Sequence, residues 1–563
     1  MRRRSVSAFL HWPALIVTLN LLLLPASVAH AFGEKRVLCV LNTKPSSVSV
    51  IDSETWQLLA TIPIDEKPTH AVLAPDGRFL YVTHQEGYTL RGVPKSPSLL
   101  SVVDLEARQV LKKLPVGFHV TRLGLADNGR YVICLAIGAL YVRMAKGKEN
   151  LTSLTVIDTH TQEVAFRTAG WNEVRDAAWT SDGSRIFVLG ARKHAKYRGR
   201  ISRAETRFET SHPEFHSAIR HKGELTLSVF GNLGQSPIGE FRVGERPAAL
   251  ARSQDEKWIY VIDIGAPSKD QKKNRNGAVH VVEVDTGKLA ASFDVGVLPV
   301  PLAARSGSDD FTVFGEDPVN GETGKLYRFR GNQMLPGLEL GNELGRDPQK
   351  ALYLSRENKL AILTMSSQVG IVDLQQNRVE HVVKAGRGGT TSLASVAAGA
   401  LLMGAVAAGA TLAAGAPVFI FPGLGYHPYH LGLISRPDGR VLYALDTSSG
   451  DVTAIESLEG TVLSHVKVGR DCGGLFLSAS GKLIWALSPD DFMLIDTATN
   501  QEGVRHDYGP DMGKMKVWVP MDGNRKLVFL FKKALQVWDA EEGKLLTTVE
   551  GLSEPKIVVQ SGE

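Results

Sequence analysis

The sequence predicts an all-β fold built from repeats, and three observations support this. The 563 residues are 43% hydrophobic and 22% charged, which is an ordinary globular composition. The 55 glycines and 26 prolines indicate many turns. A pair of β-hairpins recurs along the chain, without helical periodicity between the copies. The net charge of +5 is too small for this length to indicate an acidic partner by itself.

Residues 1–31 are predicted to be a signal peptide. Arg2, Arg3 and Arg4 precede a short apolar run from Ala14 to Leu24, and Ala29-His30-Ala31 has the small-x-small pattern that signal peptidase cleaves. We therefore expect a mature chain that begins near Phe32 and is exported to the periplasm, the cell surface or the medium. The alternative is that this segment stays as a membrane anchor.

The first hairpin of each unit consists of two apolar runs joined by a polar turn, as in HAVLAPDGRFLYV from His70. Its further copies begin at Arg122, Asp176, Ala248, Leu431, Gly474 and Val517, with weaker copies near Pro301 and Lys350.

The second hairpin has alternating apolar residues that lead into an acid, a polar turn and another strand, as in VSVIDSETWQLLATIPI from Val48. A carboxylate in this place can accept hydrogen bonds from the N–H groups of its own turn. We therefore expect Asp52, Asp104 and Asp158 to be turn residues rather than catalytic ones.

Two hairpins per unit make a four-stranded antiparallel sheet, and repetition at about 40 to 55 residues is typical of a β-propeller. The chain holds about ten such units, which allows one large ring or two smaller rings. Arg36 to Asn42 begins the chain in the middle of a unit, and Pro555 to Gln560 ends it on an unpaired first strand. We expect the N- and C-terminal strands to pair and complete one blade, because this removes two exposed sheet edges.

The segment from Val48 to His84 resembles the repeat of the YVTN β-propeller family, VSVIDTxTxxVxATIPVGxxPxxxAxSPDGxxLYVTN, with His84 where asparagine is usual. The resemblance covers most of the chain after residue 31 and is weakest from about residue 266 to 365. It implies a propeller found in exported and surface proteins, with a fold shared by amine-dehydrogenase heavy chains, cytochrome d1 domains and lactonases. Such a resemblance indicates architecture much better than chemistry.

A basic insertion interrupts the repeats at residues 191–226. It contains nine lysine and arginine residues, together with His212, His216 and His221. His212 and His216 would share one face of a helix and could hold a metal with a third ligand, although Pro213 lies between them. The other interpretations are a surface for an anionic partner and a solvated loop.

A second insertion, at residues 386–425, is rich in glycine and alanine. No charged residue occurs from Ser392 to Phe421, a length that could cross a bilayer. The glycines do not follow the four-residue spacing of a helix-packing face, and a span would put neighbouring blades on opposite sides of the membrane. The interpretations are a flap packed over the disc, peripheral contact with a membrane, and a transmembrane span.

Ligands of propellers bind at the mouth of the central channel, which the loop before each innermost strand reaches. The predicted residues of this mouth are His70, Arg122, Asp176, Lys350, His427, His430 and Lys516. Such a set can bind an anion or a metal, or transfer protons. The alternative is that these residues simply line a water-filled channel.

The sequence contains no nucleophile elbow, P-loop or dinucleotide-binding fingerprint in a fitting context. Cys39, Cys134 and Cys472 form no CxxC or CxxCH motif and are expected to be buried. We expect no cofactor, and no nucleic-acid binding because a basic–aromatic stripe is missing. The function we predict is an exported, non-catalytic propeller that binds a protein, a polysaccharide or another cell-envelope partner. The alternative is a propeller enzyme or redox subunit, similar to lactonases or to quinoprotein and haem d1 proteins, that uses the channel mouth.

Overall fold

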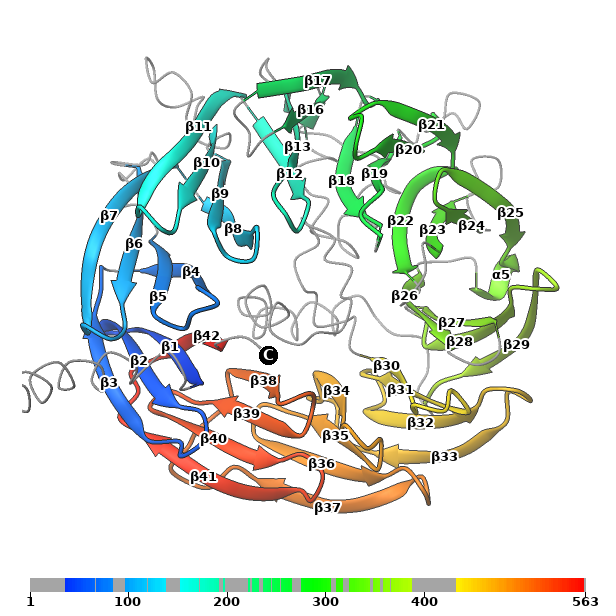
Figure 1. Cartoon of the computed structure of the whole chain (residues 1–563). Helices are drawn as coiled ribbons and strands as arrows, with labels where there is room; N and C mark the ends of the chain where they lie inside the picture. The colour runs from blue at the N-terminus through cyan, green and yellow to red at the C-terminus, as the bar shows by residue number, and fades with distance from the viewer. Residues whose placement is uncertain are drawn as a thin grey trace, which may run out of the picture.

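The computed structural model describes residues 36–386 and 432–560, apart from gaps at 66, 85–96, 119, 138–151, 172, 192–195, 198–220, 223–224, 232–235, 245, 254, 266–274, 305–309, 317–323, 345–347, 355–357 and 365. Ten four-stranded antiparallel sheets form the blades of a β-propeller around one axis (Figure 1). We number the blades in chain order, so that blade 1 begins with the first strand of the first complete sheet and blade 10 closes the ring. The predicted fold class and the predicted ten units are confirmed.

Blades 1 to 9 each contain the two predicted hairpins, whereas the inner pair of blade 10 joins strands from the two ends of the chain. The first strand of each sheet in our numbering is the innermost. The innermost strands of blades 1 to 10 are β4 (Pro68–Leu73), β8 (Val120–Ala126), β12 (Glu173–Trp179), β18 (Pro247–Arg252), β22 (Val297–Ala304), β26 (Pro348–Leu354), β30 (Leu433–Ser435), β34 (Gly474–Leu477), β38 (Val517–Met521) and β42 (Pro555–Gln560). The second strands are β5 (Phe79–His84), β9 (Tyr131–Ile137), β13 (Arg185–Ala191), β19 (Trp258–Asp263), β23 (Asp310–Glu316), β27 (Lys359–Thr364), β31 (Val441–Asp446), β35 (Leu483–Leu487), β39 (Lys526–Leu530) and β1 (Val37–Thr43).

The second hairpin of each blade forms its outer half (Figure 1). The third strands are β6 (Ser98–Asp104), β10 (Thr152–Asp158), β16 (Thr226–Gly231), β20 (Ala278–Glu283), β24 (Gly324–Arg330), β28 (Gln368–Asp373), β32 (Asp451–Glu456), β36 (Asp491–Asp496), β40 (Ala534–Asp539) and β2 (Ser46–Asp52). The outermost strands are β7 (Gln109–Gly117), β11 (Glu163–Trp171), β17 (Ser236–Arg242), β21 (Leu289–Asp294), β25 (Gln333–Glu339), β29 (Arg378–Lys384), β33 (Val462–Lys467), β37 (Gln501–Asp507), β41 (Lys544–Glu550) and β3 (Leu58–Pro63).

Blade 10 is shared by the two ends of the chain, as predicted. Strand β42 pairs antiparallel with β1, with Cys39 opposite Val559 and Val40 opposite Val558. The backbone N–H of Ser553 also donates to Oδ1 of Asn42 at 3.1 Å. The C-terminal strand therefore completes the sheet that β1, β2 and β3 begin.

The blades form one ring, which decides between the two arrangements that the sequence allowed. Ten buried apolar clusters occur, one centred on each interface between neighbouring blades, including those on both sides of blade 10. Propellers usually have four to eight blades, so a ring of ten has a wider inner wall than most.

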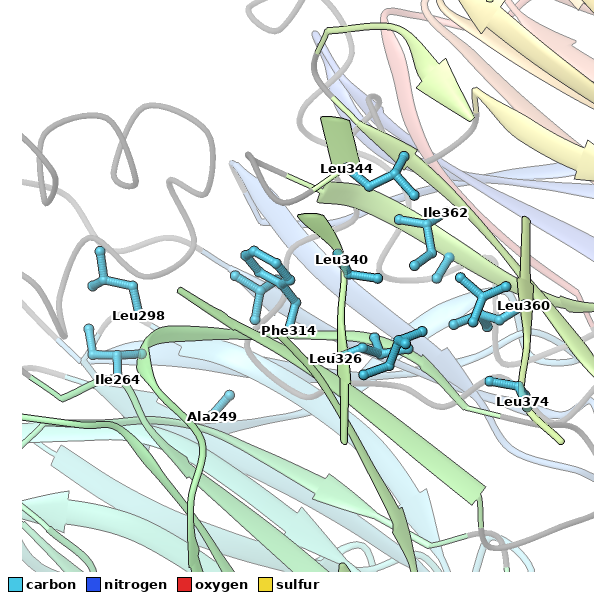
Figure 2. Packing of buried hydrophobic residues seen from close by; sticks show 14 residues of the cluster. Ala249, Ile264, Leu298, Phe314, Leu326, Leu340, Leu344, Leu360, Ile362 and Leu374 are labelled. Atoms are coloured by element: carbon cyan, nitrogen blue, oxygen red, sulfur yellow. The ribbon is translucent and has the colours of Figure 1, made fainter. Parts of the chain in front are cut away.

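Figure 2 shows the cluster centred between blades 5 and 6, in which apolar side chains from the facing sheets meet. The short helix α5 (Gly341–Leu344) contributes Leu344, which is fully buried. A Cβ atom at Gly370 of β28 would lie 2.2 Å from Cδ1 of Leu344, so any larger residue here would displace this side chain from the sheet.

The turn acids have the structural role that the sequence predicted. Oδ1 of Asp52 accepts hydrogen bonds from the N–H groups of Glu54 and Thr55, at 3.0 and 2.8 Å. Asp104 accepts from Ala107 in the same way, and Asp158 accepts from His160. These carboxylates hold the turn between the third and fourth strands.

Every outermost strand shows an irregularity in its pairing with the third strand. A β-bulge bends an edge strand and disrupts its row of free hydrogen-bonding groups. The repeated bulge therefore protects the ten outer edges from pairing with other chains.

All three cysteines are free and buried, as predicted. Burial raises the pKa of the Cys39 and Cys472 thiols to about 12 and also raises the pKa of Cys134. No helix in the described parts of the chain is long and apolar enough to cross a membrane. The insertion at 386–425 lies outside the described residues except for Gly386, so its interpretations stay predictions.

Candidate functional site

The innermost strands form the inner wall of the ring and carry four of the predicted ligand-binding residues. In six blades, a single extra residue interrupts the pairing near the start of this strand, and these bulged residues are Thr69, Thr121, Arg175, Ala248, Gln349 and Lys556. Blade 5 has two such irregularities, between Val297 and Val300 and between Pro301 and Ala303. A bulge changes the direction of the strand and of the side chains beside it.

One position recurs in all ten blades, namely the residue opposite the fifth residue of the second strand, and we call it the wall position. Its occupants in blades 1 to 10 are His70, Arg122, Asp176, Ala249, Val300, Lys350, Gly432, Gly474, Val517 and Ile557. Four residues of the predicted mouth, His70, Arg122, Asp176 and Lys350, thus occupy equivalent places. Lys516 lies one residue before the wall position of blade 9, because that blade has no bulge. His427 and His430 fall outside the described residues.

The side chain of Arg122 reaches the innermost strand of the next blade. Its Nη1 donates to the carbonyl oxygen of Ala177 at 3.0 Å, and its Nη2 lies 2.5 Å from Oδ1 of Asp176. Burial lowers the pKa of Arg122, while the Asp176 charge acts in the opposite direction. The two wall positions of blades 2 and 3 therefore form a buried ion pair.

Asp176 is fully buried between blades 3 and 4, where backbone groups satisfy its carboxylate. Oδ1 accepts from the N–H of Ala177 at 2.7 Å, and Oδ2 accepts from the N–H of Leu250, in blade 4, at 2.8 Å. Burial raises its pKa to about 7, although Arg122 and these two N–H groups favour the charged form. Because no part of the side chain is exposed, this geometry favours a structural role over contact with a ligand.

Further side-chain bonds join the innermost strands of blades 2, 3 and 4. Nη1 of Arg175 donates to the carbonyl of Pro247 at 2.7 Å, and Nη1 of Arg252 donates to that of Trp179 at 2.9 Å. Nε1 of Trp179 donates to the carbonyl of Leu125 at 3.2 Å. This part of the wall is held by its own polar groups.

Lys350 occupies the wall position of blade 6 in a different setting. The side chain is partly buried, and it makes no hydrogen bond or ion pair with any other described residue. Burial lowers the pKa of its ammonium group to about 8. The next wall position, in blade 7, is Gly432, which offers no carboxylate. Gly432 lies beside Leu363, the residue that pairs with Lys350.

His70 and Lys516 complete the predicted wall residues that the structure describes. His70 is partly buried, and its Nδ1 lies 3.4 Å from Oγ1 of Thr83. Lys516 is partly buried, and its backbone N–H donates to the carbonyl of Leu530 at 2.8 Å. The Lys516 ammonium has no partner among the described side chains.

The predicted metal ligands fall almost entirely outside the described residues. His212 and His216 are not described, and His221 begins the two-residue strand β15 (His221–Lys222), which pairs with β14 (Lys196–Tyr197). Both short strands lie between β13 and β16 in the chain. Within the described part of the chain, no three histidine, cysteine or acidic side chains are grouped to hold a metal ion.

The sequence analysis missed two residues of the wall region. Arg246 is only 1% exposed, and its Nη1 donates to the carbonyl of Gly265 at 2.9 Å, while its N–H bonds Oδ2 of Asp263. The sequence signal that could have identified Arg246 was its position directly before Pro247, where the innermost strand of blade 4 begins. Gly432 was missed because it draws attention only as the wall position that follows Lys350, which lies in another blade.

Comparison with known proteins finds only distant likenesses among solved structures. No family model and no curated protein matches the chain. Among solved structures, it is similar to a dihydro-heme d1 dehydrogenase, NirN, in complex with DHE, at 13% identity over 93% of this chain and 75% of that chain, with a TM-score of 0.42. A eukaryotic initiation factor aligns at 12% identity over 94% and 98%, with a TM-score of 0.41. Kuenenia stuttgartiensis hydrazine synthase aligns at 15% over 73% and 90%, with a TM-score of 0.31.

These likenesses are too distant to support an argument about a ligand or a reaction. The YVTN resemblance of the repeats stays a prediction as well.

Proposed function

We propose that this chain is an exported, non-catalytic β-propeller that binds an acidic polymer of the cell envelope at its inner wall. The observation that carries the proposal is the balance of charge on that wall. The ten innermost strands contain two acids, Glu173 and Asp176, and five lysine or arginine residues, Arg122, Arg175, Arg252, Lys350 and Lys556. Lys516 lies directly before the innermost strand of blade 9.

Internal pairing accounts for the charges in blades 2 to 4 but not for the lysines elsewhere. Arg122 is paired with Asp176, and Arg252 lies 2.5 Å from Glu256. Lys350, Lys516 and Lys556 form no ion pair within the described part of the chain. The cations left on the wall attract a polyanion, and they do so more strongly when the wall is not fully solvated.

The acid and the thiols with shifted pKa values support binding rather than catalysis. A general acid or base must come within hydrogen-bond reach of its substrate. Asp176, the carboxylate whose pKa is raised to about 7, is enclosed by Arg122, Ala177 and Leu250. The three thiols are buried and their pKa values raised, so they are poor nucleophiles.

Titration of the purified protein with dextran sulfate, followed by calorimetry, tests the proposal, with neutral dextran as the control. We expect binding to dextran sulfate that weakens as salt is added, because ions screen the attraction, and no binding to neutral dextran. N-terminal sequencing of the exported protein is expected to begin at Phe32. Absence of binding at low salt would overturn the binding proposal. A metal or a visible chromophore in stoichiometric amount would favour the enzyme alternative instead.

A further inference from the structure

The wall positions of blades 6 and 7 are a lysine and a glycine, whereas those of blades 2 and 3 are an arginine and an aspartate. The side chain at a wall position reaches toward the innermost strand of the following blade, as Arg122 does toward Ala177 and Asp176, and as Asp176 does toward Leu250. By this repeat geometry, the Lys350 side chain is directed to β30 and to Gly432, which directly precedes this strand. In blade 3 the equivalent residue is an aspartate, and in blade 7 it is a glycine.

We propose that a ligand oxyanion, a carboxylate, sulfate or phosphate group, binds between Lys350 and Gly432 in the place that the Asp176 carboxylate takes beside Arg122. The inference deepens the proposed function, on which it rests, because it assigns one subsite for the acidic groups of the polymer. A partly buried ammonium without a counter-charge gains more from an oxyanion than an exposed lysine does, since less water screens the interaction.

The residues next to this subsite leave room for an anion. Two successive wall positions, Gly432 in blade 7 and Gly474 in blade 8, carry no side chain. A Cβ atom at Gly432 would lie 3.4 Å from Cδ2 of Leu363, which is an ordinary contact, and the backbone there is not in the left-handed region. A side chain is therefore tolerated at this position, so the subsite can be filled by mutation.

Gly432→Asp is the decisive variant, because it places a carboxylate where the anion is proposed to bind. Gly432→Asn is the matched control, since it has nearly the same size without the charge. The readout is acetylation of Lys350 by a limiting amount of acetic anhydride at pH 7.5, measured by peptide mass spectrometry. An amine with a lowered pKa reacts faster than an ordinary lysine, because more of it is uncharged.

In the wild type and in Gly432→Asn we expect Lys350 to be among the fastest-reacting lysines, and dextran sulfate to slow its acetylation by about tenfold. In Gly432→Asp the reaction is already slow without polymer, and the polymer changes it little. Lys350→Gln is expected to weaken dextran sulfate binding in calorimetry, and its circular dichroism spectrum, unchanged from wild type, shows that the fold is intact.

Inorganic phosphate distinguishes the sources of the anion. Protection of Lys350 by phosphate and polymer alike supports a subsite for any small oxyanion, and protection by the polymer alone supports a subsite for groups on a chain. If the polymer still binds but neither probe protects Lys350, the subsite is wrong and the proposed function stands. If dextran sulfate does not bind at all, the proposed function itself fails.

Discussion

The interface between blades 2 and 3 and the interface between blades 6 and 7 contain equivalent wall positions but differ in their charge balance. In the first, Arg122 lies against Asp176, and backbone N–H groups satisfy the rest of the carboxylate. In the second, the wall position that follows Lys350 is a glycine, and the Lys350 ammonium has no partner in the described structure. The difference teaches that a repeated position on a propeller wall becomes structural when its complement is built into the next blade. Where the complement is missing, the same position is available to a ligand.

The largest expected effect comes from making the first interface like the second. Asp176→Gly removes the carboxylate and leaves the Arg122 guanidinium buried without its counter-ion. Breaking a buried pair from one side costs about 3–5 kcal/mol, so we expect a loss of that size in the free energy of unfolding. Urea denaturation followed by circular dichroism measures it.

Asp176→Asn is the control for this variant, because an amide oxygen still accepts from the Ala177 or Leu250 N–H group. Its loss is expected to be smaller. A loss below about 1 kcal/mol for Asp176→Gly would contradict the view that this pair supports the ring.

The next effect concerns Lys350, whose pKa is lowered from 10.5 to about 8. Between these values the unfolded chain binds more protons than the folded one, so the contribution of Lys350 makes stability rise with pH from about 8 to 10.5. Below pH 8 the folded protein carries the cost of the desolvated charge. Lys350→Met removes that cost and is expected to be more stable than the wild type by about 2 kcal/mol at pH 7, a figure that allows for partial exposure.

The gain from Lys350→Met must shrink as the pH rises from 8 to 10.5, and urea denaturation at a series of pH values measures the difference. Comparing the two proteins at each pH cancels the titration of the other lysines and tyrosines. A gain that stays constant over this range would show that Lys350 is not desolvated in the folded protein.

A smaller effect is expected when the second interface is given the complement of the first. Gly432→Asp supplies a partner for Lys350 and is expected to stabilise the fold by about 1 kcal/mol relative to Gly432→Ala at pH 7. The double-mutant cycle with Lys350→Met isolates the pair, because the advantage of aspartate over alanine should disappear in that background. An equal advantage in both backgrounds would mean that the introduced carboxylate acts through another group.

The smallest effect belongs to an exposed pair that serves as a reference. Nζ of Lys514 lies 3.0 Å from Oδ2 of Asp490, with both side chains more than half exposed. Lys514→Ala is expected to change the unfolding free energy by less than about 0.5 kcal/mol. A change as large as that of Asp176→Gly would show that burial does not explain why the Arg122–Asp176 pair matters more than an exposed pair.

The repeats and the closing blade could be predicted from the sequence because hairpin patterns are local. Pro68 to His84 shows two strands and a turn without any reference to distant residues, and Pro555 to Gln560 is visibly an incomplete unit. The choice between one ring and two could not be predicted, since it depends on packing between blades that no single repeat contains.

The wall was predictable only in part, for the same reason. Aligning the repeats placed His70, Arg122, Asp176 and Lys350 at one position, but the alignment could not show that the Leu250 N–H donates to Asp176 or that Gly432 lies beside Leu363, the residue that pairs with Lys350. Lys516 was predicted to share this position, but it lies one residue earlier, because blade 9 lacks the bulge. A bulge shifts the residue positions along a strand and has no clear signature in the sequence.

The shared blade also sets the order of events during folding. The hydrogen bond from Ser553 to Asn42 joins residues 511 positions apart, and β42 is synthesised after the strands of the other blades. The first nine blades can assemble while the chain is still growing, but β1 keeps an open edge until β42 arrives. A chain truncated before Pro555 is therefore expected to remain an open arc with two exposed ends. Through these ends it is expected to associate with other truncated copies.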